Sequence, residues 1–447
     1  MNRSLKKMVS FALLICLLLS FAQISSAEEQ AVPKYRATSI RQLKLRDTPD
    51  LNARGIASIP ENTTLDILEI VDDNFKVLYN NRAGYVQSKF FKNFQVNLPS
   101  VKSAEQAAPQ PEQETAAGES SAKIVVSSAD SSFNTEEPFT PRYKAKNTRA
   151  AALFKGPDEK SGFVVAVPRY SEELVLSQIK GDWAMAMYAN KVGYIRTDIL
   201  VQYDFIDPYA ERFPGITNYQ YAAVLPVDTP LYDRKNTAKV HKVIPAGAVI
   251  GVEPPDENGF MHVAYMKRRH ALIKESNAIE LVKVVPYSEA KKGDLISVFT
   301  SFFPVHNSNL DIIGRVYNMY HSADMLNGRV LQPGEQVSMN QMIGPYKKFK
   351  GYMKAPIASK VADTGYGGGT CQLNTTVYNT LLQVPVLVNH RRVHSKSGAV
   401  YVPVGFDAAV GSISTIDMKF TNTLPYPIML QYYVSDNILT SLIYRAE

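Results

Sequence analysis

The sequence predicts a multidomain protein, in which small all-β barrels are followed by an α+β domain with helices packed on a mainly antiparallel sheet. Three observations predict this. Short runs of alternating apolar residues recur through the first two thirds of the chain, a stretch without aromatic residues divides them, and helical spacing takes over from about Val298. With 447 residues, 45% of them hydrophobic, the chain is long enough for several domains with their own cores.

The first 27 residues have the pattern of a secretory signal peptide. Three basic residues precede an apolar run from Val9 to Ile24, and small residues follow at Ser25-Ser26-Ala27. The apolar core is shorter than the roughly 20 residues of a spanning helix, so we expect cleavage and no membrane span in the mature protein. The sequence therefore predicts an exported protein. Since neither an outer-membrane strand pattern nor a second anchor appears in the sequence, we expect it to be associated with the envelope of a Gram-positive cell.

The net charge and the cysteine content limit the classes of function that the protein can have. Without the signal peptide the chain keeps 46 basic and 42 acidic side chains, a net charge of +4, which argues against a dedicated nucleic-acid binder. Cleavage also removes Cys16 and leaves Cys371 as the single thiol. A lone cysteine in an exported chain cannot form an internal disulfide, so it is a buried apolar group, an intermolecular link or a reactive group.

The first module is predicted over residues 33–95 as a β-barrel of five short strands. Its segments LKLRDTPD, IPENTTLDIL and FKVLYNNRAGYVQSKF resemble a bacterial Src-homology-3-like (SH3-like) domain. Residues 96–140, which begin with a stretch rich in Pro, Ala, Gln, Glu and Ser, are predicted to be a disordered linker, because such a composition buries too little apolar surface to offset the entropy of ordering.

The same pattern returns twice after the linker. Residues 141–203 form a second predicted SH3-like barrel, in which Gly193-Tyr194-Ile195 matches Gly84-Tyr85-Val86. Residues 216–284 are predicted to be a third, degenerate copy, which lacks the closing Gly-Tyr pair. Their aromatic residues either bind wall polymers or pack inside the barrels, and several weak modules on one chain would raise avidity for an extended surface.

The C-terminal domain is predicted over residues 295–447. Its first helix has apolar residues at helical spacing from Leu310 to Tyr320 and is followed by Gly328. A second helix follows the glycines Gly367, Gly368 and Gly369, with Thr370 as the expected N-cap and Cys371 in the first turn. Unpaired amides and the helix dipole favour an anion there, and the glycines would let a substrate approach the sulfur.

Antiparallel strands are expected after this helix, in PVLVNHRRVH, AVYVPVGFDAAV, IDMKFTN, IMLQYYV and LTSLIYRA. His394 ends the first of these segments, and Asp407 lies in the second. Together with Cys371 they supply a nucleophile, a base and an orienting group in chain order. This order of helix and sheet resembles the core of transglutaminase-like and papain-like enzymes, although the spacing of 23 residues from Cys371 to His394 is shorter than usual there.

A more specific resemblance comes from several motifs in order, namely LQPGEQVSMNQMIGPYKKFKGYMKAPI, GGGTCQLNTTVYNTLL, HRRVHS, YVPVGFDAAV and DMKFTNTLPYPIML. Together they resemble a VanW-family domain. The resemblance implies an exported Gram-positive protein of the kind that accompanies glycopeptide-resistance clusters. It implies no particular activity, so the catalytic hypothesis depends on the residues themselves.

Two hypotheses follow, both with peptidoglycan or another wall polymer as the partner. In the first, the domain is a thiol enzyme acting on acyl or peptide bonds, with Cys371, His394 and Asp407 as the triad and Gln372 in the oxyanion hole. In the second, it binds the wall without catalysis. The residues assigned to binding are Gly367, Gly368, Gly369, Arg391, Arg392, Ser395 and Tyr401.

His390 is a reserve base for the first hypothesis. A metal site made from Cys371, His390, His394 and Asp407 is the weakest hypothesis, because no tight ligand pair such as Cys-x-x-Cys is present. We therefore expect neither a metal nor a cofactor.

Overall fold

The structure is a computed structural model that describes residues 35–71, 74–96, 133–265, 269–303, 310–357, 363–394, 399–435 and 438–447. The predicted signal peptide and most of the predicted linker lie outside the described residues. The chain divides into two compact units, Met1–Val101 and Lys102–Glu447.

The first unit contains one antiparallel sheet of seven strands, in the order β3-β2-β6-β5-β4-β1-β7. Its strands are β1 (Tyr35–Ser39), β2 (Leu43–Arg46), β3 (Gly55–Ile59), β4 (Thr64–Val71), β5 (Asn74–Tyr79), β6 (Arg82–Gln87) and β7 (Phe91–Val96), with a 3-10 turn at Ser88–Phe90. Alternate residues such as Leu45, Ile67, Phe75 and Val77 are fully buried, because successive side chains of a strand point to opposite faces.

The second module has the same strand order, β10-β9-β13-β12-β11-β8-β14, as an internal repeat requires. Its strands are β8 (Tyr143–Asn147), β9 (Ala151–Phe154), β10 (Phe163–Val167), β11 (Val175–Lys180), β12 (Trp183–Tyr188), β13 (Lys191–Arg196) and β14 (Leu200–Phe205), with a 3-10 turn at Thr197–Ile199. The same physical reason explains why both modules have a glycine at the matched position. A Cβ at Gly84 would lie 2.6 Å from the carbonyl oxygen of Arg46, and one at Gly193 would lie 2.7 Å from that of Phe154.

Each module has seven strands where five were expected. In both sheets the strands at the two ends of the order, β3 and β7 or β10 and β14, are not paired with each other within the described parts of the chain. A closed barrel is therefore not seen, and the SH3-like assignment stays a prediction.

The third module is built differently, because its strands divide between two sheets, β18-β15-β21 and β17-β16-β20-β19. They are β15 (Tyr221–Leu225), β16 (Thr229–Asp233), β17 (Asn236–Ile244), β18 (Ala248–Val252), β19 (Phe260–Tyr265), β20 (Arg269–Lys274) and β21 (Glu280–Lys283). Its core includes Phe302 and Ile438, which belong to the C-terminal domain, so the two share one core.

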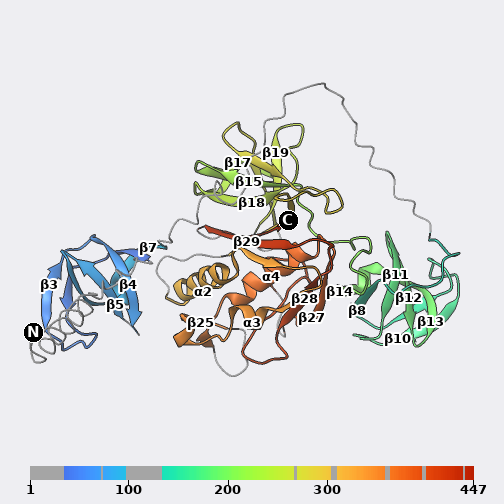
Figure 1. The fold of residues 1–447 in the computed structure, drawn as a ribbon, viewed down its shortest axis with the longest axis horizontal. Coiled ribbons are helices and arrows are strands. Elements are labelled where there is room, and N and C mark those ends of the chain that lie inside the picture. Colours follow the sequence, from blue (N-terminus) through green and yellow to red (C-terminus); the bar gives the residue numbers. More distant parts are fainter. Residues whose placement is uncertain are drawn as a thin grey trace, which may run out of the picture. The chain divides into compact units, whose positions relative to one another are not determined.

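The C-terminal domain places helices on antiparallel sheets, as expected (Figure 1). One sheet has the order β22-β30-β29-β23, another β24-β28-β27, and β25 pairs with β26. The strands are β22 (Leu295–Phe302), β23 (Arg329–Leu331), β24 (Gln336–Ser338), β25 (Lys354–Pro356), β26 (Thr364–Tyr366), β27 (Val386–Arg391), β28 (Met418–Asn422), β29 (Ile428–Ser435) and β30 (Ile438–Arg445). The helices are α2 (Leu310–Leu326), α3 (Met339–Ile343) and α4 (Thr370–Leu381), with a 3-10 turn at Lys348–Lys350.

Two local predictions are wrong. The N-cap of α4 is Gly369, with φ of 105°, and Thr370 is already helical; its hydroxyl donates to the carbonyl of Gly367 at 2.8 Å. The segment 399–410, expected to be a strand, has no regular secondary structure. Its carbonyl groups are instead bound by side chains of α4, as described next.

Candidate active site

One face of α4 holds the irregular segment through side-chain hydrogen bonds to its backbone. Asn379 donates to the carbonyl of Phe406 at 2.9 Å, and both Asn374 and Thr375 donate to that of Ala408, at 3.0 and 3.1 Å. These bonds satisfy carbonyl groups that would otherwise need a neighbouring strand. We call residues 405–410 the clamped segment, and its function is to fix the position of Asp407.

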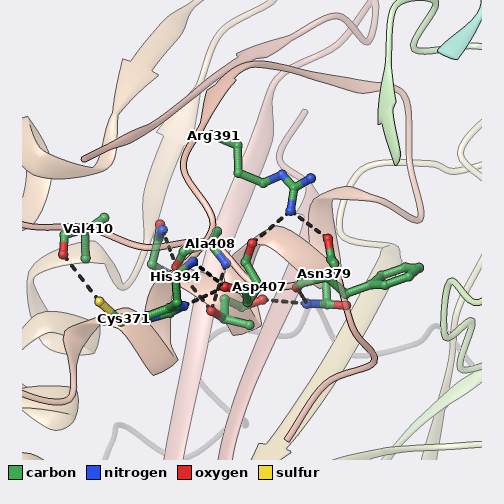
Figure 2. Close-up of polar contacts among 11 residues, drawn as sticks. Cys371, Asn379, Arg391, His394, Asp407, Ala408 and Val410 are labelled. Atoms are coloured by element: carbon green, nitrogen blue, oxygen red, sulfur yellow. Dashed lines mark hydrogen bonds and ion pairs between the residues drawn. The ribbon is translucent and has the colours of Figure 1, made fainter. Parts of the chain in front are cut away.

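Asp407 lies in the clamped segment and binds His394 twice. Its Oδ2 accepts a hydrogen bond from the backbone N–H of His394 at 2.7 Å and lies 2.6 Å from His394 Nδ1 (Figure 2). The carboxylate is buried and the ring half-buried. This geometry fixes the imidazole and leaves Nε2 for another partner.

The ionisation of both groups reflects this pairing. Burial lowers the pKa of His394, but hydrogen bonds with Asp407 and Cys371, together with the negative charges of these groups, raise it to about 10. Burial raises the pKa of Asp407, but the hydrogen bonds from His394 bring it below its ordinary value. The protonated form of His394 is therefore favoured beside the Asp407 carboxylate.

Cys371 lies in the first turn of α4, where the helix dipole favours an anion; the neighbouring amides of Thr370 and Gln372 donate to the carbonyls of Gly367 and Gly369. It is a free cysteine and half-buried. Its Sγ lies 3.3 Å from the carbonyl oxygen of Val410, at the end of the clamped segment (Figure 2). The structure thus brings the three predicted triad residues into one hydrogen-bonded group.

Arg391, predicted to bind a ligand, has an internal set of partners. Its Nη1 donates to the carbonyls of Gly405 and Asp407 at 2.7 and 2.9 Å, and its Nε donates to Asp204 at 2.9 Å. Only 3% of its side chain is exposed, and the guanidinium lies over the ring of Tyr378. It therefore holds the clamped segment through two of its carbonyl groups, and ligand binding by this residue stays a prediction.

Gln372 is buried, and its side chain is bound by other parts of the domain. Its amide nitrogen donates to Ser301 Oγ and to the carbonyl of Phe302 at 3.2 and 3.3 Å, and its oxygen accepts from Arg315 at 3.0 Å. Both ends of the carboxamide are occupied, so its predicted place in an oxyanion hole stays untested.

The three glycines before α4 are in close contact with the protein itself. A Cβ at Gly367 would lie 2.8 Å from the ring of Tyr346, one at Gly368 2.5 Å from the carbonyl oxygen of Pro356, and one at Gly369 2.6 Å from that of Arg315. Gly367 and Gly369 also have positive φ. Close packing of this loop on Tyr346, β25 and α2 thus accounts for the three glycines in turn, and the predicted approach of a substrate stays a prediction.

The remaining predicted residues fall in different places. Tyr401 is near the triad: burial raises its pKa, and the charges of Cys371 and Asp407 raise it further. Arg392 is exposed. The half-buried ring of His390 lies 3.3 Å from the carbonyl of Thr415, and no contact with the triad is seen among the described residues. Ser395 lies outside the described residues.

Two polar residues of α2 near the site were not predicted. Asn318 is fully buried and binds the backbone of Met353 twice and the carbonyl of Gly368 once. Arg315 packs against Gly369 and binds Gln372. Both lie between apolar residues of α2. A polar residue in such surroundings is often buried with a specific partner, and this signal could have identified both as residues near the site.

Residues 314–444 match the sequence model of the family described as VanW like protein. The chain carries a VanW-like domain at its C-terminus. The domain contains Cys371, His394, Asp407 and the whole of the clamped segment.

Two curated relatives match part of the chain. The uncharacterized protein YoaR of Bacillus subtilis is 36% identical over 118 residues, which are 26% of this chain and 38% of that protein. The vancomycin B-type resistance protein VanW of Enterococcus faecalis is 29% identical over 93 residues, 20% of this chain and 34% of that protein. The chain therefore spans little more than a third of the length of either relative.

Among solved structures, NlpC2 and NlpC1 of Trichomonas vaginalis each match 57% of this chain, and 97% and 92% of their own chains. Both are 10% identical, with TM-scores of 0.15 and 0.14, and scores this low support no inference. In the described parts of the chain no helix is long and apolar enough to cross a membrane, and no cluster of three or more His, Cys, Asp or Glu side chains could hold a metal ion.

Proposed function

We propose that this is an exported cell-wall protein whose VanW-like domain is a thiol enzyme acting on acyl or peptide bonds. The observation that carries the proposal is the position of His394, whose Nδ1 lies 2.6 Å from Asp407 and which also interacts with Cys371. A nucleophile, a base and a group that orients the base are the parts that nucleophilic catalysis requires.

The chemistry follows from this arrangement. The Cys371 thiolate attacks the carbonyl carbon of the substrate, and His394, held at Nδ1 by Asp407, gives its proton from Nε2 to the leaving amine. The carbon–nitrogen bond breaks and a thioester remains on the sulfur. Neutral His394 then takes a proton from water or from an acceptor amine, which attacks the thioester and restores the thiolate.

A place at the cell wall is supported by the match to a protein named for vancomycin resistance. The repeated modules would add weak binding sites for wall polymer and so raise the avidity of the whole chain. Peptidoglycan stem peptides, which carry amide bonds and free amines, are substrates of the required chemistry.

The test is to look for the thioester itself. The mature protein is incubated with purified stem peptides, quenched in acid and analysed by intact-protein mass spectrometry. We expect an acyl adduct on Cys371 that is absent in Cys371→Ala and forms about 10²-fold more slowly in His394→Ala, since general base catalysis contributes that order of rate. If the protein sediments with peptidoglycan but never forms an adduct, the domain is a binding module with a structural cysteine and catalysis is disproved.

A further inference from the structure

Arg315 carries a positive charge that no carboxylate neutralises within the described parts of the chain. Its one hydrogen bond is from Nη2 to Gln372 Oε1, at 3.0 Å. Its Nε is buried and has no hydrogen-bond partner among the residues described. A guanidinium has five N–H donors, so a half-buried one without a counter-ion keeps donors for an anionic ligand.

The guanidinium lies beside the first turn of α4. The Arg315 backbone oxygen and Cγ are 2.6 and 2.7 Å from the position that a Cβ of Gly369 would take, and Gln372 directly follows the nucleophile. Arg315 and Cys371 also both affect the hydroxyl group of Tyr401. Burial has the largest effect and raises the pKa of Tyr401. The charge of Cys371 raises this pKa further, and the charge of Arg315 lowers it. The guanidinium is thus held beside the first turn of α4, the turn that carries Cys371.

We propose that Arg315 binds a carboxylate of the substrate, so that the domain acts on short peptides with a free carboxylate close to the reacting bond. This inference rests on the proposed function and adds the substrate class to it. The planar guanidinium can hold a carboxylate through two parallel N–H···O bonds, which fixes the orientation of the substrate as well as its charge. Because Arg315 is only half-buried, a ligand can reach it.

The test uses two reagents of nearly the same size. Iodoacetate and iodoacetamide both alkylate Cys371 with loss of iodide, but only iodoacetate has a carboxylate. We expect the ratio of the iodoacetate rate to the iodoacetamide rate to fall about tenfold in Arg315→Gln, since bonds to charged groups are worth that order of affinity. Because iodoacetamide has no carboxylate, its rate reports any general effect of the substitution on Cys371, and the ratio corrects for that effect.

Arg329→Gln is the matched control, because it removes the same charge from an exposed guanidinium of the same domain, at the start of β23. Its ratio should equal that of the wild type. An unchanged ratio in Arg315→Gln, or an equal fall in both variants, would overturn the inference. The proposed function fails separately, if the iodoacetamide rate does not depend on His394.

A second measurement needs no variant. N-acetyl-alanine and its amide are compared as protectors of Cys371 against iodoacetamide in the wild-type protein. We expect the carboxylate compound to slow alkylation and the amide to have little effect. Equal protection by the two, or none, contradicts carboxylate binding.

Discussion

The charge of His394 depends on its two neighbours. A carboxylate on one side and a sulfur on the other raise its pKa to about 10, from an ordinary value of 6.5, against the effect of burial. The folded protein therefore binds this proton more tightly than the unfolded chain does. The proton stabilises the fold below pH 6.5, and that contribution is lost as the pH rises toward about 10.

This predicts a pH-dependent difference in stability. The free energy of unfolding should be higher for the wild type than for His394→Ala. This difference should be largest near pH 6 and should shrink steadily up to pH 10. Urea unfolding at several pH values measures it. His390→Ala is the control, since its ring contacts the carbonyl of Thr415. A difference that stays constant or grows with pH contradicts the assignment.

At the scale of the element, the start of α4 depends on residues without a side chain. Gly368→Ala would place a Cβ 2.5 Å from the carbonyl oxygen of Pro356, a backbone atom that cannot move aside easily. We expect a loss of about 2–3 kcal/mol in the free energy of unfolding, as for other overpacked sites. Gly411→Ala, where the nearest atom is 3.6 Å away, should cost less than about 1 kcal/mol. Thermal or urea unfolding compares the two, and equal stabilities would show that the loop is loosely packed.

The elements show what local sequence could predict. Apolar residues recur with the helical period in α2 and α4 and with the two-residue period in strands β27 to β30. The helix over residues 310–320 and these strands after Pro385 were therefore predicted correctly. The segment 399–410 has a strand-like pattern too, but its carbonyl groups are bound by Asn374, Thr375 and Asn379 of α4. Which group binds a backbone carbonyl is a tertiary fact that no local pattern contains.

The site shows the same limit. The residue types and chain order of Cys371, His394 and Asp407 were enough to predict the triad as a hypothesis, because that chemistry needs few residue types. The structural roles of Arg391 and Gln372 were not predicted, since both depend on partners far away in sequence, Asp204 and Ser301.

At the scale of the whole molecule, the second module belongs to the same compact unit as the VanW-like domain. Asp204, at the end of β14, binds Arg391, which in turn holds the clamped segment through two carbonyl groups. Arg212, just beyond β14, donates to the carbonyls of Leu382 and Val384 at the end of α4. The second module is thus a support for the site as well as a repeat.

This predicts an effect across the two domains. Asp204→Asn leaves the buried Arg391 without its carboxylate and should cost about 2–3 kcal/mol of stability, somewhat less than a fully buried pair because Asp204 is 35% exposed. Alkylation of Cys371 should also be slower in Asp204→Asn than in the wild type. Asp198→Asn, which breaks exposed ion pairs of the same module with Arg149 and Arg196, should cost under about 1 kcal/mol. If the two variants are equally stable, the modules are independent.

The most direct test of the central claim is the pH dependence of iodoacetamide alkylation of Cys371 in the mature protein and in His394→Ala. We expect the wild type to react fast at neutral pH, with a half-maximal rate well below the value of about 8.5 at which ordinary thiols titrate. His394→Ala should react slowly at pH 7 and follow an ordinary thiol. Slow alkylation with the same profile in both proteins would contradict the triad.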